Sequence, residues 1–141
     1  MIATTFTAVQ TASVAATVLV AGVAAFQVAL ALSVPLGGAV FGGKAPTRDG
    51  VLTAPFRVLA IVQAIILLLL GWILLARAGV VPIPVLASAT LVGASWVIVV
   101  FLLLNTVANF FAPHPVERWV MGSITFVLCG LALFIALSAQ T

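Results

Sequence analysis

The stretch PFRVLAIVQAIILLLLGWILLA, Pro55 to Ala76, decides the fold, because it is almost wholly apolar and carries one charge, Arg57, near its start. A helix of about 20 apolar residues, rising roughly 1.5 Å per residue, crosses the hydrocarbon layer of a bilayer. The apolar residues form one continuous run without strict alternation, which indicates a helix and not a barrel strand. The stretch is therefore predicted to be a transmembrane helix.

Three more apolar runs of this length predict three more spans, at Phe6 to Leu32, Val85 to Ala108 and Val116 to Ala139. Composition agrees, because 65% of the residues are hydrophobic and 5% are charged, against about 25% charged in soluble domains. The first run lacks a basic leader and is too long for a secretory signal. We expect an all-α, polytopic membrane protein with a four-transmembrane-helix bundle, forming a single transmembrane domain over residues 1–141.

Nucleic-acid and nucleotide binding are both disfavoured. The sequence pI of about 10.7 reflects scarce acids and not a basic surface, and a nucleic-acid site needs clustered Lys and Arg. GAVFGGKA, Gly38 to Ala45, matches the spacing of a phosphate-binding loop, but Ala45 stands where Ser or Thr is needed and no strand precedes it. We interpret the glycine-rich segment as lying on or dipping into the membrane interface, followed by an exposed turn at KAPTRDG.

Orientation follows from basic residues near the span ends. Lys44, Arg48, Arg57 and Arg118 belong to the first and third loops and their flanks, whereas Arg77 and the amino terminus lie on the other side. This distribution predicts that the first and third loops are cytoplasmic and that both termini are outside.

Residues at the span ends have helix-capping character. Gly79 is placed to act as a left-handed C-cap after span two. His114 is interpreted as a loop or cap residue before span four. Glu117 falls in the first turn of that span, beside unpaired N–H groups, and is interpreted as a helix-start carboxylate with Arg118 as its neighbour.

Two short segments resemble each other. TAPFR, Thr53 to Arg57, and HPVER, His114 to Arg118, each place a potential cap residue four positions before an arginine, with a proline between them. An internal repeat leaves such a similarity, and so does chance. The pattern leaves both explanations open.

Small residues recur along three spans and predict helix faces that pack against other helices. In span one they recur at every fourth position: Ser13, Thr17, Ala21, Ala25, Ala29 and Ser33. Span two carries Ala60, Ala64 and Gly71, and span four carries Gly122, Thr125, Cys129, Ala132 and Ala136. We expect these faces to be buried in a compact bundle.

Polar side chains gather at one membrane level and form the candidate ligand-binding site: Gln27, Arg57, Gln63, Asn105, Asn109, Glu117 and Arg118. Polar groups in hydrocarbon need partners. In a structural interpretation, the amides bridge helices, the arginines anchor at headgroups and Glu117 pairs with one of them. In a functional interpretation, the same groups hold an anionic headgroup, a metabolite or an ion.

Catalytic, metal and cofactor sites are not expected. One histidine excludes bis-histidine haem ligation, and His114, Asp49, Glu117 and Cys129 have no recognisable zinc spacing. No paired carboxylates or Ser-His-Asp arrangement are present locally. We expect a protein that is not an enzyme and that carries no cofactor.

The runs PLGGAVFGGK, VLTAPFR and NTVANFFAPHPVERW resemble those of uncharacterised small four-span bacterial integral membrane proteins of the high-GC type. The resemblance covers most of the chain. It implies a bacterial inner-membrane setting and no particular activity.

Two classes of function fit these observations. The first is a component of a membrane assembly or a binder of lipid or hydrophobic ligand, acting without catalysis. The second is a small oligomeric channel or transporter, since four short helices rarely enclose a path alone. In either class the expected partners are membrane lipids and a second copy or another membrane protein.

Overall fold

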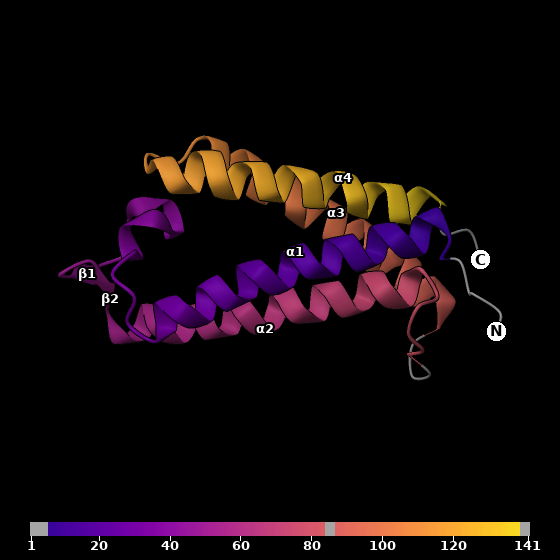
Figure 1. Ribbon diagram of the computed structural model, residues 1–141, viewed down its shortest axis with the longest axis horizontal. Coiled ribbons are helices and arrows are strands. Elements are labelled where there is room, and N and C mark those ends of the chain that lie inside the picture. The colour runs from indigo at the N-terminus through magenta and orange to yellow at the C-terminus, as the bar shows by residue number, and fades with distance from the viewer. Residues whose placement is uncertain (1–5, 84–86, 139–141) are drawn as a thin grey trace.

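The computed structural model describes residues 6–83 and 87–138 and is an all-α four-helix bundle (Figure 1). The helices are α1 (Ala8–Ala31), α2 (Ala54–Arg77), α3 (Ser88–Phe110) and α4 (Gly122–Ser138). A single turn of π-helix, η3 (Val116–Met121), leads into α4. Four spans are long and apolar enough to cross a membrane, and they begin and end within a few residues of the predicted ones. The multi-pass fold expected from the sequence is confirmed.

The bundle consists of two antiparallel hairpins, α1–α2 and α3–α4. Helices pack most extensively within each hairpin, and less between α1 and α4 or between α2 and α3. The hairpins lie close together near the chain termini and diverge toward the opposite end (Figure 1). Loop 1 (residues 32–53) and loop 3 (residues 111–115) lie at the divergent end.

The main apolar core fills the half of the bundle nearest the termini, here called the packed half. Its buried members include Ala12, Ala16 and Val20 of α1, Leu70 and Leu74 of α2, Ile98 of α3, and Ala132, Ile135 and Ala136 of α4. Small side chains let the backbones approach, and the Thr17 hydroxyl donates across to the Gly71 carbonyl oxygen at 3.3 Å. Between 28% and 33% of each span is buried, so most of each helix surface faces outward, as lipid requires.

The predicted small faces of spans two and four are confirmed in most positions. Ala60, Ala64 and Gly71 of α2 are buried. Gly122, Ala132 and Ala136 of α4 are buried too, while Thr125 and Cys129 are half-buried.

The predicted small face of span one is wrong beyond its first turns. Ser13 is buried and Thr17 half-buried, but Ala21, Ala25 and Ser33 are exposed. A strict repeat of four advances about 40° per step around a helix of 3.6 residues per turn, so it cannot stay on one face. The buried face shifts between steps of three and four: Ala12, Ala16, Val20, Ala24, Gln27, Leu30 and Ala31.

Loop 1 is a folded unit that covers the divergent end. It contains two short turns, η1 (Gly37–Ala39) and η2 (Phe41–Gly43), and a small antiparallel hairpin of β1 (Thr47–Arg48) and β2 (Val51–Leu52). Asp49 and Gly50 have φ of 53° and 80°, the positive values that a two-residue hairpin turn requires.

Loop 1 also packs against the helices of the bundle. Val40, Ala45 and Leu52 join Leu30 and Ala60 in a second buried cluster. The KAPTRDG segment contains the predicted exposed turn, at Asp49 and Gly50. It also contains β1, and Ala45 within it is buried.

The helix ends follow the predicted capping. Gly79 has φ of 71°, its N–H donates to the Ala76 carbonyl oxygen, and the Val80 N–H donates to the Leu75 carbonyl oxygen, which is the Schellman arrangement. The Nδ1 of His114 accepts from the Val116 N–H at 3.2 Å. His114 is therefore a cap residue, as interpreted from the sequence.

A polar cavity beneath loop 1

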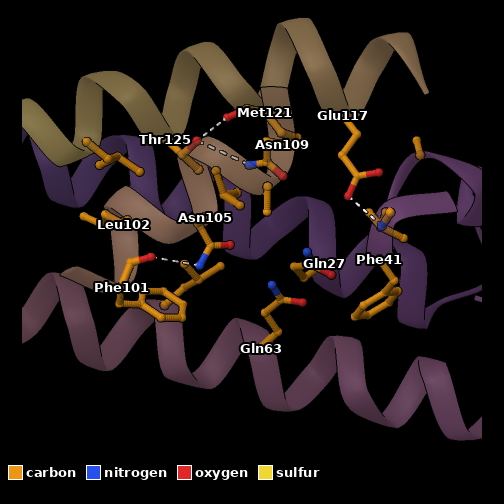
Figure 2. Close-up of a pocket in the computed structure, with 17 residues that line it drawn as sticks. Gln27, Phe41, Gln63, Phe101, Leu102, Asn105, Asn109, Glu117, Met121 and Thr125 are labelled. Carbon is orange, nitrogen blue, oxygen red and sulfur yellow. Dashed lines mark hydrogen bonds between the residues drawn. The ribbon is translucent and has the colours of Figure 1, made fainter. Parts of the chain in front are cut away.

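A cavity of about 290 Å³ lies between the two hairpins at the divergent end, beneath loop 1. Five of the seven predicted site residues line it: Gln27 of α1, Gln63 of α2, Asn105 and Asn109 of α3, and Glu117 of η3. Figure 2 shows these side chains around one space, to which both hairpins contribute. The structure therefore brings together the polar residues that the sequence placed at one membrane level.

The deeper wall of the cavity is apolar. Four apolar residues that line the cavity each lie one helical turn from a polar one, toward the middle of the bundle. They are Val23 below Gln27, Leu67 below Gln63, Leu102 below Asn105 and Leu128 below Thr125. We call these four residues the floor. Residues 39–42 of loop 1 line the opposite side and form the roof.

Glu117 is buried, with 7% of its surface exposed. Its Oε1 accepts a hydrogen bond from the Gly42 N–H of the roof at 2.9 Å, while its Oε2 is buried and has no hydrogen-bond partner in the described chain. The placement of Glu117 in the first turn of span four is confirmed. Its side chain does not stay at the helix start, however, but reaches across the bundle end to loop 1.

The two predicted arginines do not line the cavity. The Nε of Arg57 donates to the Ala31 carbonyl oxygen at 2.6 Å, and the Nε of Arg118 donates to the Ala112 carbonyl oxygen at 2.9 Å. Each arginine thus satisfies a carbonyl at the end of the helix before it, where backbone acceptors lack helical partners.

The predicted ion pair between Glu117 and an arginine is also wrong, since neither pairing is present in residues 6–83 and 87–138. The similarity between TAPFR and HPVER has a physical basis, because Arg57 and Arg118 perform the same task.

The four amides differ in how they are bonded. The Nδ2 of Asn109 donates to the Thr125 hydroxyl at 3.3 Å and bridges α3 and α4, as the structural interpretation predicted. The Nδ2 of Asn105 donates to the Phe101 carbonyl oxygen of its own helix. Gln27 is 5% exposed and its Oε1 is buried with no partner in the described chain. Gln63 is half-buried and makes no hydrogen bond within that part of the chain. Bridging therefore accounts for one amide of the four.

Sequence reasoning missed the other lining residues, among them Phe41, Gly42 and Thr125. Phe41 and Gly42 have φ of 55° and 68°, and a bulky residue in this left-handed region is strained. The Phe41 ring packs edge-to-face on Phe56 at 5.5 Å, which helps to hold the turn. The adjacent glycines in FGGK were the available signal for such a turn, and the hydroxyl of Thr125 within an otherwise apolar span was the signal for that residue.

The chemistry of the lining is limited to one carboxylate, four amides and one hydroxyl among apolar side chains. The described residues contain no group of three or more His, Cys, Asp or Glu that could hold a metal ion. Comparisons with protein-family models, curated proteins and solved structures found no match for the chain.

Proposed function

We propose that this protein is a non-catalytic membrane binding protein that holds a small ligand in the cavity beneath loop 1. The observation that carries the proposal is the pair of buried oxygens, Gln27 Oε1 and Glu117 Oε2, that have no hydrogen-bond partner in the described chain and whose side chains line one cavity. Leaving a buried polar atom unpaired costs about 1 to 3 kcal/mol. Two such atoms on side chains that line one cavity support a site for a ligand.

The alternative is a small oligomeric channel or transporter. The packed half counts against a path through a single chain, because the core that fills it is apolar and its hydroxyls bond to backbone. Ser13 donates to the Gln10 carbonyl oxygen and Ser95 donates to the Val92 carbonyl oxygen. A channel would need an interface between copies, and flux in proteoliposomes would support that alternative.

Support for binding without catalysis comes from the lining itself. General acid–base catalysis uses positioned groups that exchange protons, and Glu117 is the one acid of the lining. A partner membrane protein, a second copy and surrounding lipids are the proposed neighbours of the lipid-facing surface.

Native mass spectrometry of the full chain in detergent tests the proposal. We expect a bound small mass on the wild type and its loss from Gln63→Phe, which places a ring inside the cavity. The matched control is Val62→Phe, since Val62 is the adjacent residue of α2 and is exposed on the outer surface. A wild type without a bound mass, or equal retention by both variants, would contradict the proposal. The same spectra report oligomers and bound partners.

We also propose that the protein lies in a bacterial inner membrane with loops 1 and 3 in the cytoplasm. Lys44, Arg48, Arg57 and Arg118 lie at the divergent end, against Arg77 at the other, and short cytoplasmic loops carry excess basic residues. Cysteines introduced at Thr47 and His114 should react with an impermeant reagent only from the cytoplasm, and one at Pro82 only from outside. Reversed labelling would place the cavity in the outer leaflet.

A further inference from the structure

We propose that the ligand of the cavity is a small amphipathic cation, a protonated amine with a short apolar body. Its ammonium group would contact Glu117 and Gln27, and its apolar body would lie against the floor. This inference rests on the proposed binding function and specifies the chemical class of the ligand.

The charge of the cavity is the first argument. Glu117 is the charged side chain of the lining, whereas Arg57 and Arg118 donate to backbone carbonyls outside it. An unpaired carboxylate in a low-dielectric site is costly, and a cation offsets that cost. An anionic headgroup would meet this carboxylate without a lining arginine to compensate for the repulsion. Of the anionic headgroup, metabolite or ion that the sequence cluster allowed, this lining disfavours the anionic headgroup.

The unpaired atoms are the second argument. Glu117 Oε2 and Gln27 Oε1 are both acceptors, so the ligand must supply hydrogen-bond donors. The Gly42 N–H is already used by Glu117 Oε1, and the amide nitrogens of Gln27 and Gln63 donate to neither unpaired oxygen. An ammonium group offers three donors and no acceptor, which matches what these two oxygens lack.

The walls are the third argument. Figure 2 shows Glu117 and Phe41 on one side of the cavity and Phe101 and Leu102 on the other, with Gln27 and Gln63 between them. The floor residues Leu67 and Leu128 extend the apolar side. A bare metal ion would leave this apolar surface without a contact, whereas the hydrocarbon part of an amine would cover it. The volume of about 290 Å³ is at the lower limit of about 300 to 1,000 Å³ for small-molecule pockets, which favours a short body.

Three probes of nearly equal shape test the charge preference: butylammonium, butan-1-ol and butanoate. Each is titrated calorimetrically into the full chain in detergent. Because charge-assisted hydrogen bonds are roughly twice as strong as neutral ones, we expect butylammonium to bind about tenfold tighter than butan-1-ol. Butanoate should bind more weakly than the alcohol.

Variants then assign the preference to one carboxylate. Glu117→Gln should bind butylammonium and butan-1-ol equally, because the amide keeps an acceptor for the Gly42 N–H but has no charge. Asp49→Asn is the matched control, since Asp49 is exposed on the turn of the loop 1 hairpin, and it removes the same charge at the same end of the molecule. It should keep the full preference for the cation. Glu117→Asp keeps the charge and should keep a preference for butylammonium over the alcohol.

The outcomes separate this inference from the proposed function. Equal binding of butylammonium and butan-1-ol to the wild type would overturn the cation inference and leave a ligand-binding cavity in place. The wild-type ranking needs no variant, so a poorly folded Glu117→Gln would not prevent the decision. If none of the probes binds and native mass spectrometry finds no bound mass, both the inference and the binding function fail.

Discussion

The two halves of this bundle are built from the same kinds of apolar residue but differ in how tightly their helices pack. In the packed half, Ala16, Val20 and Leu74 are fully buried and the helices touch. In the other half, here called the cavity half, the hairpins diverge and enclose a space lined by amides and a carboxylate. Two buried oxygens there lack partners in the described chain.

This difference indicates that the packed half supplies stability and that the cavity half contains arrangements that lower it. Natural proteins tolerate unfavourable local arrangements at functional sites when other parts of the fold supply enough stability. We therefore expect substitutions in the packed half to lower stability, and substitutions of cavity-lining polar residues to affect ligand binding more than folding.

The largest expected effect compares one leucine from each half. Leu74 is fully buried in the packed half, and Leu102 is 1% exposed but lines the cavity. Leu74→Ala should lower the free energy of unfolding by about 2 to 5 kcal/mol, the range for new voids in well-packed sites. Leu102→Ala should cost less, because it only enlarges an existing space. Reversible unfolding in mixed micelles measures both, and an equal loss would erase the distinction between the halves.

The next effect tests close packing at the start of α4. A Cβ at Gly122 would lie 3.0 Å from the Phe110 ring of α3. Gly122→Leu should therefore cost about 1 to 3 kcal/mol in unfolding free energy, the usual range for overpacking. Gly130 has nothing within 4 Å of its Cβ position, so Gly130→Leu is the control and should be close to neutral. A Gly122→Leu protein as stable as the parent would show that the hairpin is not tightly packed there.

A smaller effect of opposite sign is expected from Gln27. Gln27→Leu removes a buried amide oxygen that has no partner in the described chain, and the apolar side chain has a similar size. Thermal unfolding of the ligand-free protein should show an unchanged or higher stability, by up to about 1 kcal/mol, while ligand binding is lost. A clear loss of stability would mean that Gln27 contributes to folding, and the contrast between the halves would weaken.

The smallest expected effect is the coupling between Arg57 and Glu117. The two side chains bond to different partners, Ala31 and Gly42. A double-mutant cycle of Arg57→Gln and Glu117→Gln should therefore be additive to within about 0.5 kcal/mol. A coupling energy of several kcal/mol in the unfolding data would reveal a direct ion pair.

The number, length and direction of the helices were predictable, because hydrocarbon imposes a strong requirement on sequence. An apolar run such as Pro55 to Ala76 has no other stable arrangement in lipid. The face that each helix buries was less predictable. Lipid-facing and helix-facing positions are both apolar, so the exposed Ala25 and the buried Ala24 are indistinguishable by residue type. The small residues of span one therefore predicted the wrong face.

The level of the polar cluster was predictable, but the directions of its side chains were not. Arg57 and Gln63 share one helix and neighbouring turns, yet only Gln63 lines the cavity. The long arginine side chain reaches a carbonyl of the preceding helix, and nothing in the residue pattern specifies that choice. The direction of the Glu117 side chain was not predictable for a similar reason, because its partner, Gly42, is 75 residues away in sequence. The Asp49-Gly50 pair, in contrast, is a preferred sequence for a two-residue hairpin turn, and the interpretation of loop 1 did not use it.

The bond between Gly42 and Glu117 also sets an order of assembly. Loop 1 leaves the ribosome long before Glu117 does, because the bonded residues are 75 positions apart and the segment between them includes all of α2 and α3. Forming this contact closes a long segment, and the loss of chain entropy must be offset before the contact adds to stability. The α1–α2 hairpin can therefore insert and pack while its loop still lacks this anchor. Only the arrival of the fourth span completes the roof, so a chain that stops before η3 would retain the α1–α2 hairpin and α3 but no complete site.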